Sequence, residues 1–451
     1  MKDTIAAIST ALGVGAISIV RVSGEAAINY VNSIFKGADL TKKESHTITY
    51  GHIVYQDEVI DEVLVSVMRS PKTFTMEDVV EINCHGGIAT TNKILEVLLR
   101  IGCRLAEPGE FTKRAFLNGR IDLVEAESIM NVIEAENESA MRVAMKGLDG
   151  YLSQKIHVLR QRILELLASI EVNIDYPEYE DAQEMTNQNI LPTVRQIIQE
   201  LSDLVEKSEN GQILTTGIKT AIIGRPNVGK SSILNKLLKE EKAIVTDIEG
   251  TTRDMVEGKV NIGGVTLHII DTAGIRETED VVEKIGVEKS LHLIEDATLI
   301  LVVLNNNEPL TIEDEQILKE VANKTVIYVI NKSDLPTKIN LDAIPAKDRV
   351  FTNTVEWEGI RALEEKIIEK FHLNELKNND YTYLSSARQI SLAKEALEGL
   401  KEVEKSCSSE IPVDLLEIDI KRSWEKLGEM IGETYSEELI DQLFSQFCLG
   451  K

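Results

Sequence analysis

The sequence predicts a multidomain protein of mixed α/β and α class, in which two α/β regions alternate with two helical regions. The chain has 451 residues, more than a single ordinary domain of roughly 100–200 residues. Strand-like and helix-like runs alternate in residues 5–120 and again in residues 217–373. The stretches that follow each of these regions instead repeat apolar residues at helical spacing. We therefore expect two to four domains.

Residues 5–120 show the mixture of short strands and helices expected of an α/β domain. Val14–Val22 alternates small and apolar residues before the turn residues Ser23-Gly24, which indicates a strand. The other elements expected here are strands at 63–68 and 79–82, a helix at 89–99, and a helix from Glu110 onward, after the Pro108-Gly109 turn.

Residues 121–210 are expected to be almost wholly helical. Their apolar residues recur every three or four positions and form an amphipathic stripe: Leu152, Ile156, Leu159, Ile163, Leu166 and Ile170. A second helix is expected over about 191–206, with a boundary at Asn210-Gly211. Helical spacing returns after Asn378-Asn379. These stretches suggest one helical bundle split by an inserted domain, with boundaries at 1–119, 120–216, 217–375 and 376–451.

The charge of the chain is unevenly distributed. Lys and Arg total 49 against 75 Asp and Glu, a net charge of −26. Residues 1–120 carry 13 basic and 14 acidic residues, a net of −1, so the remaining residues carry −25. A strongly negative field repels polyanions. An anionic ligand is therefore repelled least by the N-terminal region, and a nucleic-acid partner must be bound through local basic patches.

Three features exclude other classes of protein. No apolar run reaches the roughly 18 residues that span a bilayer, and the first ten residues lack the pattern of a signal peptide. The four cysteines, Cys84, Cys103, Cys407 and Cys448, form no C-x-x-C pair, so neither a zinc ribbon nor a disulfide framework is expected. We expect reduced thiols, a cytoplasmic location and no membrane contact.

The second α/β region contains a phosphate-binding motif. Residues 224–231 read G-R-P-N-V-G-K-S and fit G-x-x-x-x-G-K-[ST], between the strand-like run Thr220–Ile223 and a helical stretch. The glycines let backbone N–H groups surround the phosphates. Lys230 is expected to reach the β- and γ-phosphates, and Ser231 to bind Mg²⁺.

Three further motifs follow in the order typical of GTPases. Asp271-Thr272-Ala273-Gly274 is expected to contact Mg²⁺ and sense the γ-phosphate. Asn331-Lys332-Ser333-Asp334 follows another strand-like run, and its Asp carboxylate can accept two hydrogen bonds from guanine. Gly250–Asp254, which lies between the phosphate loop and Asp271, supplies a threonine suited to Mg²⁺. Together they predict a GTPase, with an ATPase or an inactive nucleotide-binding fold as the alternatives.

Ile275 and the loop Phe351–Thr354 depart from the Ras-like pattern, and Asn227 is a candidate cation ligand. Ile275 stands where a water-orienting Gln is common, so hydrolysis must use another group or be slow. The carbonyl oxygen of the Asn227 side chain can ligate a monovalent cation close to the phosphates, or the residue merely shapes the loop. The loop at Phe351–Thr354 reads Thr-Asn-Thr where Ser-Ala-Lys is usual, which leaves its base contacts open.

Cys448 lies in the ending Phe447–Lys451, which does not fit a prenylation signal because Gly450 is not aliphatic and Lys451 is unusual as a last residue. A lone cysteine is more often structural than reactive. A lowered thiol pKa beside Lys451 is the alternative.

This ending, the segment Pro108–Leu123 and the phosphate loop Gly224–Ser231 together resemble the MnmE (TrmE) family of tRNA modification GTPases, over essentially the whole chain. The resemblance implies an N-terminal α/β domain that binds formyl-tetrahydrofolate and dimerises, a discontinuous helical domain, and an inserted P-loop Ras-like GTPase domain. It also implies a homodimer that acts with the flavoprotein MnmG on the wobble uridine of certain tRNAs. There it adds an aminomethyl or carboxymethylaminomethyl group, with Mg²⁺, K⁺ and the folate as cofactors.

The resemblance also implies roles for individual residues. Glu283 matches a glutamate proposed to act through water in hydrolysis, and Cys448 matches a reactive thiol of unsettled role. The implied metal ligands are Asn227, Thr246, Ile248 and Thr251 for K⁺, and Ser231 and Thr252 for Mg²⁺. The implied folate contacts are Arg21, Glu81, Arg120 and Lys451. The GTP contacts are Asn227, Val228, Gly229, Lys230, Ser231, Ser232, Thr246, Asp247, Ile248, Glu249, Gly250, Thr251, Thr252, Asp271, Thr272, Ala273, Gly274, Asn331, Lys332 and Asp334.

Two functions of other classes predict features that this sequence lacks. A regulatory switch GTPase of the Era type, acting in ribosome assembly, predicts a basic flank, whereas residues 1–120 have a net charge of −1. A membrane-remodelling GTPase of the dynamin sort predicts a basic or apolar membrane-facing patch, which the sequence does not show.

Overall fold

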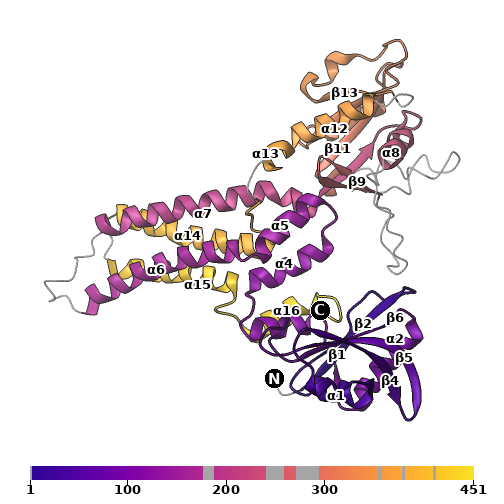
Figure 1. Ribbon diagram of the computed structural model, residues 1–451. Coiled ribbons are helices and arrows are strands. Elements are labelled where there is room, and N and C mark those ends of the chain that lie inside the picture. Colours follow the sequence, from indigo (N-terminus) through magenta and orange to yellow (C-terminus); the bar gives the residue numbers. More distant parts are fainter. Residues whose placement is uncertain are drawn as a thin grey trace. The chain divides into compact units, whose positions relative to one another are not determined.

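The computed structural model describes residues 3–175, 187–239, 258–270, 294–353, 358–377, 381–409 and 413–451 (Figure 1). The chain divides into two compact units. The first comprises residues 1–130, 153–195 and 392–451, and the second comprises residues 131–152 and 196–391. Both units are therefore assembled from segments that lie far apart in the sequence.

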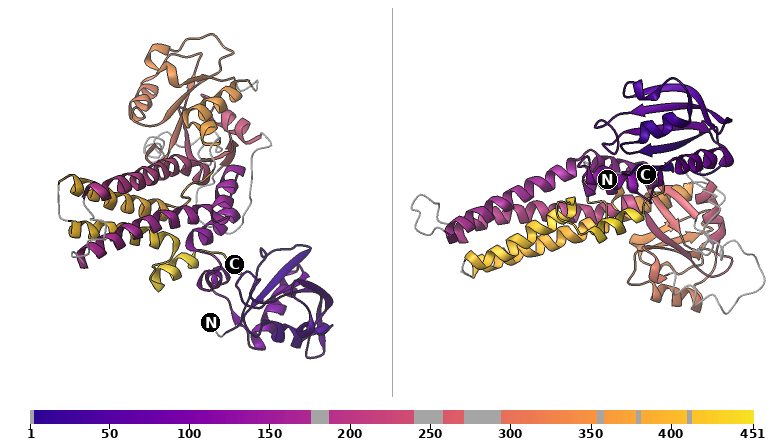
Figure 2. Two further views of the ribbon diagram at one scale, coloured as in Figure 1. Left: turned by 60° about the vertical axis from the view of Figure 1, so that its left-hand side comes forward. Right: turned by 90° about the horizontal axis from the view of Figure 1, so that it is seen from below.

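A seven-stranded sheet forms the N-terminal part of the first unit, in the order β3-β4-β5-β6-β2-β1-β7. Every pair is antiparallel except β1 with β7. The strands are β1 (Ile5–Ile8), β2 (Ile17–Ser23), β3 (Phe35–Gly37), β4 (Thr47–Tyr55), β5 (Glu58–Met68), β6 (Val79–His85) and β7 (Arg104–Leu105). Helices α1 (Ala27–Ile34) and α2 (Ile88–Arg100) pack on one face of the sheet through an apolar core (Figure 2).

Strand β4 was not expected from the sequence, because its pattern of burial runs against its hydropathy. Thr49, Gly51 and Ile53 are buried, whereas Ile48 and Tyr50 are exposed. Gly51 leaves space for the ring of Phe35, since a Cβ atom there would stand 2.4 Å from Phe35 Cζ. The buried face of this strand therefore contains Thr49 and Gly51, so the alternation of apolar and polar residues that usually indicates a strand is absent.

The helices of the first unit include a layer that packs against the sheet domain. α3 (Glu110–Leu117), α4 (Leu123–Glu134) and α16 (Glu437–Ser445) share one apolar cluster, and α4 continues into the second unit. Phe116, Phe444 and Phe447 supply its aromatic rings. The last helix of the chain is therefore packed against the helix that follows the N-terminal sheet. Four further helices belong wholly or in part to this unit: α6 (Tyr151–Asp175), α7 (Asn187–Thr216), α14 (Ala387–Ser408) and α15 (Val413–Ile431).

The expected helix boundary at Asn210-Gly211 is wrong, because α7 continues to Thr216. Gly211 serves close packing instead: a Cβ atom there would stand 2.7 Å from the ring of Tyr383. The helix ends at Gly217, whose φ of +70° suits a glycine that terminates a helix.

The second unit contains a six-stranded sheet in the order β13-β12-β11-β8-β10-β9. All neighbouring strands are parallel except the edge pair β9 and β10. The strands are β8 (Ile218–Ile223), β9 (Gly258–Ile262), β10 (Val265–Ile269), β11 (Leu299–Asn305), β12 (Val326–Asn331) and β13 (Arg349–Phe351), and the helices are α5 (Glu138–Leu148), α8 (Lys230–Lys239), α11 (Ile312–Glu320), α12 (Glu358–Lys370) and α13 (Leu373–Lys377).

Two apolar clusters cover the two faces of this sheet, as expected for a doubly wound fold. β11 is buried at every position, which explains why its residues 299–304 are all apolar. Among the described helices, none has an apolar stretch long enough to cross a membrane.

Candidate functional site

The phosphate loop joins the end of β8 to the start of α8. Three residues in it have positive φ: Gly224 at +150°, Asn227 at +64° and Gly229 at +103°. A Cβ atom would stand 2.4 Å from the Val303 carbonyl oxygen at Gly224, and 2.1 Å from Asn331 Nδ2 at Gly229. Both glycines are therefore required, and Asn227 is of a residue type that tolerates the left-handed region.

Lys230 begins α8 and closes the loop upon itself. Its ammonium donates to the carbonyl oxygens of Gly224 at 2.7 Å and Arg225 at 2.9 Å. Burial lowers the pKa of this lysine, because the surrounding protein solvates a charge less well than water does. The loop is thus arranged around a positive charge placed at the N-terminus of a helix, which suits an anion. Ser231 and Ser232 follow in the exposed first turn of α8.

The guanine-type motif at the end of β12 is tied to the phosphate loop. Asn331 is 1% exposed, and its Nδ2 donates to the Val228 carbonyl oxygen at 2.8 Å. Lys332 donates to the Asn227 carbonyl oxygen at 3.1 Å. Asp334, two residues further on, is exposed. The structure therefore brings Asn331 and Lys332 together with the phosphate loop and leaves the Asp334 carboxylate open to a ligand.

Thr352 is a site residue whose role the sequence did not reveal. It is fully buried, and its hydroxyl donates to Asn331 Oδ1 at 3.1 Å. Its backbone oxygen also accepts from the Ser333 N–H at 3.1 Å. The departure from the usual Ser-Ala-Lys sequence therefore retains a hydroxyl that holds the base motif in place. The hydroxyl itself was the available signal, since Thr can replace Ser as a donor.

Several predicted site residues lie outside the described residues. They are Thr246, Asp247, Ile248, Glu249, Gly250, Thr251, Thr252, Asp271, Thr272, Ala273, Gly274 and Glu283. The structure therefore places one of the four implied K⁺ ligands, Asn227, and one of the two implied Mg²⁺ ligands, Ser231.

A second polar site lies on the N-terminal sheet. Arg21 on β2 and Glu81 on β6 are directly opposite each other in the antiparallel pairing. Arg21 Nε donates to Glu81 Oε1 at 2.9 Å, and both side chains are about one-fifth exposed, at 22% and 23%. The Arg21 guanidinium stands 5.6 Å from the ring centroid of Phe111. The pair thus presents adjacent positive and negative groups beside an aromatic ring.

The C-terminal segment 447–451 is docked against this same site. Arg21 Nη1 donates to the Gly450 carbonyl oxygen at 3.4 Å, and Ser9 Oγ donates to the same oxygen at 3.0 Å. The Phe111 N–H donates to the backbone oxygen of Lys451 at 3.2 Å. These contacts bring Arg21, Glu81 and the Cys448–Lys451 segment together.

The docked segment needs a glycine at position 450. Gly450 has a φ of +86°, and a Cβ atom there would stand 2.2 Å from the Ile8 carbonyl oxygen. The Cys448 thiol is exposed, while the Cys448 carbonyl oxygen accepts from the Gly109 N–H at 3.3 Å. The backbone of the segment is therefore held, and its thiol faces outward.

Arg120 makes contacts different from those of Arg21. Its Nη1 donates to the Thr73 carbonyl oxygen at 2.8 Å, and its guanidinium stands 5.1 Å from the ring centroid of Phe74. Phe74 packs against the small cluster that contains Phe111. The two arginines therefore stand over two rings that belong to one apolar cluster.

A buried ionic network anchors α3 beside this site, and sequence patterns did not reveal it. Arg114 is 1% exposed and pairs with Asp3 at 3.0 Å, Glu77 at 3.1 Å and Glu110 at 2.9 Å. Burial by itself raises the pKa of Glu110, but hydrogen bonds from Arg104, the Glu107 N–H and Arg114 outweigh it and lower the pKa. Since Phe111 lies on the same helix, this network helps to fix the position of its ring.

Two family models together match most of the chain. Residues 4–120 match the family model described as the GTP-binding protein TrmE N-terminus, and residues 123–448 match that of the MnmE helical domain. The tRNA modification GTPase MnmE of Bacillus cytotoxicus is 55% identical over 455 residues, which cover 100% of this chain and 99% of that protein. The chain belongs to the MnmE family. The tRNA modification GTPase MnmE of Bacillus anthracis is likewise 55% identical, over the same shares of the two chains.

Two solved structures are similar to part of this chain. The G domain of the T. maritima FeoB iron transporter is 29% identical, with a TM-score of 0.26, over 34% of this chain and 98% of that one. An Aquifex aeolicus Era variant bound to GDP and AlF4⁻ is 26% identical, with a TM-score of 0.23, over 40% of this chain and 66% of that one.

Membership of the MnmE family confirms three predictions made from the sequence. They are the resemblance itself, the multidomain α/β plus α fold with a P-loop GTPase domain, and the activity of a GTP hydrolase. The structure joins the phosphate loop and the Asn331 motif by a hydrogen bond within the second unit of this GTPase.

Proposed function

We propose that this protein is a K⁺-dependent GTPase that, with the flavoprotein MnmG, modifies the wobble uridine of certain tRNAs. The added group is an aminomethyl or carboxymethylaminomethyl group, and formyl-tetrahydrofolate supplies a one-carbon unit. The observation that supports this most is the docking of the Cys448–Lys451 segment beside Arg21 and Glu81. It gives an MnmE-family GTPase a second polar site that is separate in sequence from its phosphate loop.

In the nucleotide site, the residues present fit two cations. Asn227 is exposed, so the carbonyl oxygen of its side-chain amide is accessible to K⁺. Ser231, at the start of α8, supplies a hydroxyl for Mg²⁺. When bound, K⁺ would supply the positive charge that other GTPases obtain from an arginine finger, and Mg²⁺ would neutralise charge on the phosphates. Lys230 binds the phosphates, and Asp334 accepts hydrogen bonds from guanine. The hydrogen bonds of Asn331 to Val228 and Thr352 fix the loop that carries Asp334.

The remaining members of these sites lie outside the described residues, and we propose them from the family. Thr246, Ile248 and Thr251 complete the K⁺ site, Thr252 completes the Mg²⁺ site, and Glu283 acts through water in hydrolysis. The proposed GTP contacts likewise include residues 246–252 and 271–274.

In the N-terminal site, the residues present fit a folate. Glu81 is a carboxylate acceptor for the amino-pteridine edge, and Arg21 and Arg120 are cations suited to the glutamate tail or a carbonyl. Lys451, at the end of the docked segment, is the fourth proposed contact. Because Cys448 is exposed on the same segment, its thiol is available to chemistry beside the bound donor. A Cys448→Ser variant should lose tRNA modification in cells and retain GTP turnover.

The protein is proposed to be a cytoplasmic homodimer, with domains at 1–119, 120–216, 217–375 and 376–451. The net charge of −26 disfavours tRNA binding by this chain alone, so MnmG is proposed to supply much of the positive surface.

GTP turnover in KCl and in NaCl at matched ionic strength tests the proposed K⁺ dependence. Strong stimulation by K⁺, with dimerisation of the G domains in GDP and aluminium fluoride, is expected. Asn227→Ala should abolish the difference between the two salts, whereas Asn374→Ala, at an exposed position of α13, should preserve it. Equal rates in both salts with no change in association would instead favour a switch GTPase of the Era type that needs a separate activating protein.

A further inference from the structure

The β9–β10 hairpin lies in the chain between two segments that carry proposed phosphate-responsive residues. Thr252 precedes the first residue of β9, Gly258, by six positions, and Asp271 follows the last residue of β10, Ile269, by two. Lys259 on β9 and His268 on β10 are directly opposite each other in the antiparallel pairing. A group that holds both of these side chains therefore holds both strands of the hairpin.

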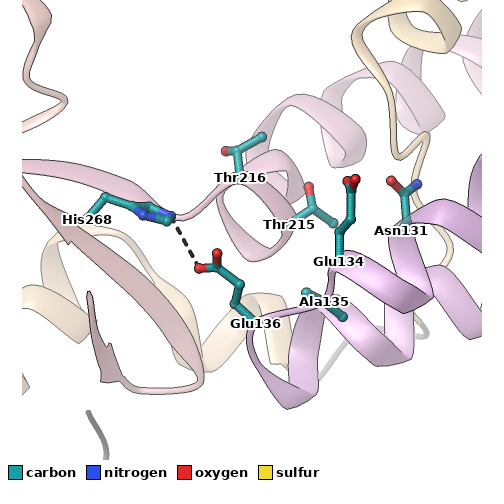
Figure 3. A pocket seen from close by; sticks show the side chains of 8 residues that line it. Asn131, Glu134, Ala135, Glu136, Thr215, Thr216 and His268 are labelled. Atoms are coloured by element: carbon teal, nitrogen blue, oxygen red, sulfur yellow. Dashed lines mark ion pairs between the residues drawn. The ribbon is translucent and has the colours of Figure 1, made fainter. Parts of the chain in front are cut away.

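Glu136 lies beside both of these side chains and is hydrogen-bonded to Lys259. It lies in the short connection between α4 and α5, and its Oε1 accepts a hydrogen bond from Lys259 Nζ at 2.6 Å. Its Oε2 lies 3.7 Å from His268 Nε2 (Figure 3). The three side chains are about one-third exposed or less, at 35% for Glu136, 33% for Lys259 and 18% for His268. The carboxylate is thus hydrogen-bonded to β9 through Lys259, and its second oxygen lies near His268 on β10 without a hydrogen bond.

The next residue, Asn137, contacts the same hairpin. Its Oδ1 accepts from the Ala140 N–H at 2.8 Å and so caps α5, while its Nδ2 donates to Thr266 Oγ1 on β10 at 3.1 Å. The same amide reaches the Leu214 carbonyl oxygen, in the last turn of α7, at 3.4 Å. The α4–α5 connection is therefore joined both to the hairpin and to the end of α7.

A cavity of about 460 Å³ adjoins this junction. Asn131 and Glu134 line it from α4, Thr215 and Thr216 from the end of α7, and Glu136 and His268 from the junction itself (Figure 3). Tightly packed interiors resist displacement, whereas a cavity leaves the bordering side chains room for a second arrangement. The junction is thus bordered on one side by a cavity, which His268 lines from the hairpin.

We propose that Glu136 is a positioning residue that transmits the nucleotide state from the β9–β10 hairpin to α5 and the end of α7. A displacement of the hairpin must either carry the α4–α5 connection with it or break the Glu136–Lys259 hydrogen bond. The role of this coupling in tRNA modification rests on the proposed function. The coupling itself requires only that the G domain changes state between GTP and GDP.

Hydrogen exchange of the full-length protein tests this proposal, with amides of 138–148 compared between the GDP state and the state with GDP and aluminium fluoride. The wild type should show a nucleotide-dependent difference, and Glu136→Gln should reduce that difference by about fivefold or more. The matched control is Glu138→Gln, an exposed carboxylate that pairs with Arg142 on α5 itself, and it should retain the difference. GTP turnover per active site should stay within about twofold in both variants, which excludes a general loss of folding.

A double variant identifies the route. If Glu136 acts through Lys259, then Lys259→Met should reduce the difference to the same extent, and Glu136→Gln with Lys259→Met should be no worse than either alone. Additive effects, an unchanged difference in Glu136→Gln, or no difference in the wild type would each overturn the proposal. K⁺ dependence measured on the same samples tests the proposed function separately, so the two failures are distinguishable.

Discussion

Arg21 and Glu81 are separated by 60 positions in the sequence, yet they face each other across β2 and β6 with a hydrogen bond of 2.9 Å. The same guanidinium also reaches the Gly450 carbonyl oxygen, at 3.4 Å. One side chain therefore orients the proposed pterin acceptor and contacts the segment that carries the exposed thiol.

Arg21→Gln should weaken binding of formyl-tetrahydrofolate by about tenfold or more, because hydrogen bonds to charged groups are worth roughly 1.5–3 kcal/mol. Calorimetric titration of the full-length protein measures this affinity. Arg100→Gln is the matched control, since Arg100 is an exposed arginine that pairs with Glu96 on α2. Equal affinities for the Arg21→Gln and Arg100→Gln variants would remove Arg21 from the proposed folate site.

Gly450→Ala should release the C-terminal segment from its docked position. The added methyl group meets the Ile8 carbonyl oxygen at 2.2 Å in a backbone conformation that alanine adopts only at a cost of about 1 kcal/mol or more. Hydrogen exchange at Phe111 and Lys451, whose N–H groups bond within this docking arrangement, should accelerate several-fold, while GTP turnover is retained. Gly13→Ala provides the control because no atom lies within 4 Å of its Cβ position. Unchanged exchange in Gly450→Ala would show that the segment tolerates a side chain there.

Thr352→Val should weaken GDP and GTP binding by about tenfold. The substitution keeps the shape of the side chain but removes the donor to Asn331 Oδ1, and a buried polar atom left without its partner costs roughly 1–3 kcal/mol. Titration with a fluorescent guanine nucleotide measures the affinity. Thr298→Val, at an exposed position before β11, should have no effect. A preserved affinity in Thr352→Val would mean that Asn331 is held by its bond to Val228 alone.

Protonation of Glu110 in acid should make the α3 region less stable. Its pKa in the folded protein lies below the ordinary value of 4.5, so the stability it contributes is present above about pH 4.5 and is lost as the pH falls through the lowered pKa. Hydrogen exchange of the α3 amides, measured from pH 6 downward and corrected for intrinsic rates, should show protection falling over that range. Glu110→Gln should lower protection at neutral pH and flatten its acid dependence. The same acid dependence in Glu110→Gln would assign the effect to another carboxylate.

The sequence allowed the nucleotide site to be predicted in more detail than the N-terminal site. Residues 224–231 form one loop and one helix start, so the spacing of Gly224, Gly229 and Lys230 carries most of the geometry. The contacts of Arg21 depend instead on the register of β2 against β6 and on a segment 429 positions away. No local pattern encodes such contacts, and only the family resemblance pointed to them.

Three features could be predicted from local sequence: the alternation of α/β and helical regions, the apolar run at 299–304 in β11, and the phosphate loop. Each depends on residues close together in the chain, where backbone preference and hydropathy act directly. Only packing brings Gly211 against Tyr383 within a continuous helix, the Thr352 hydroxyl to Asn331, and Glu136 to Lys259. These contacts join residues brought near each other only by packing, and the free energy of a contact depends on distance in space rather than on separation along the chain.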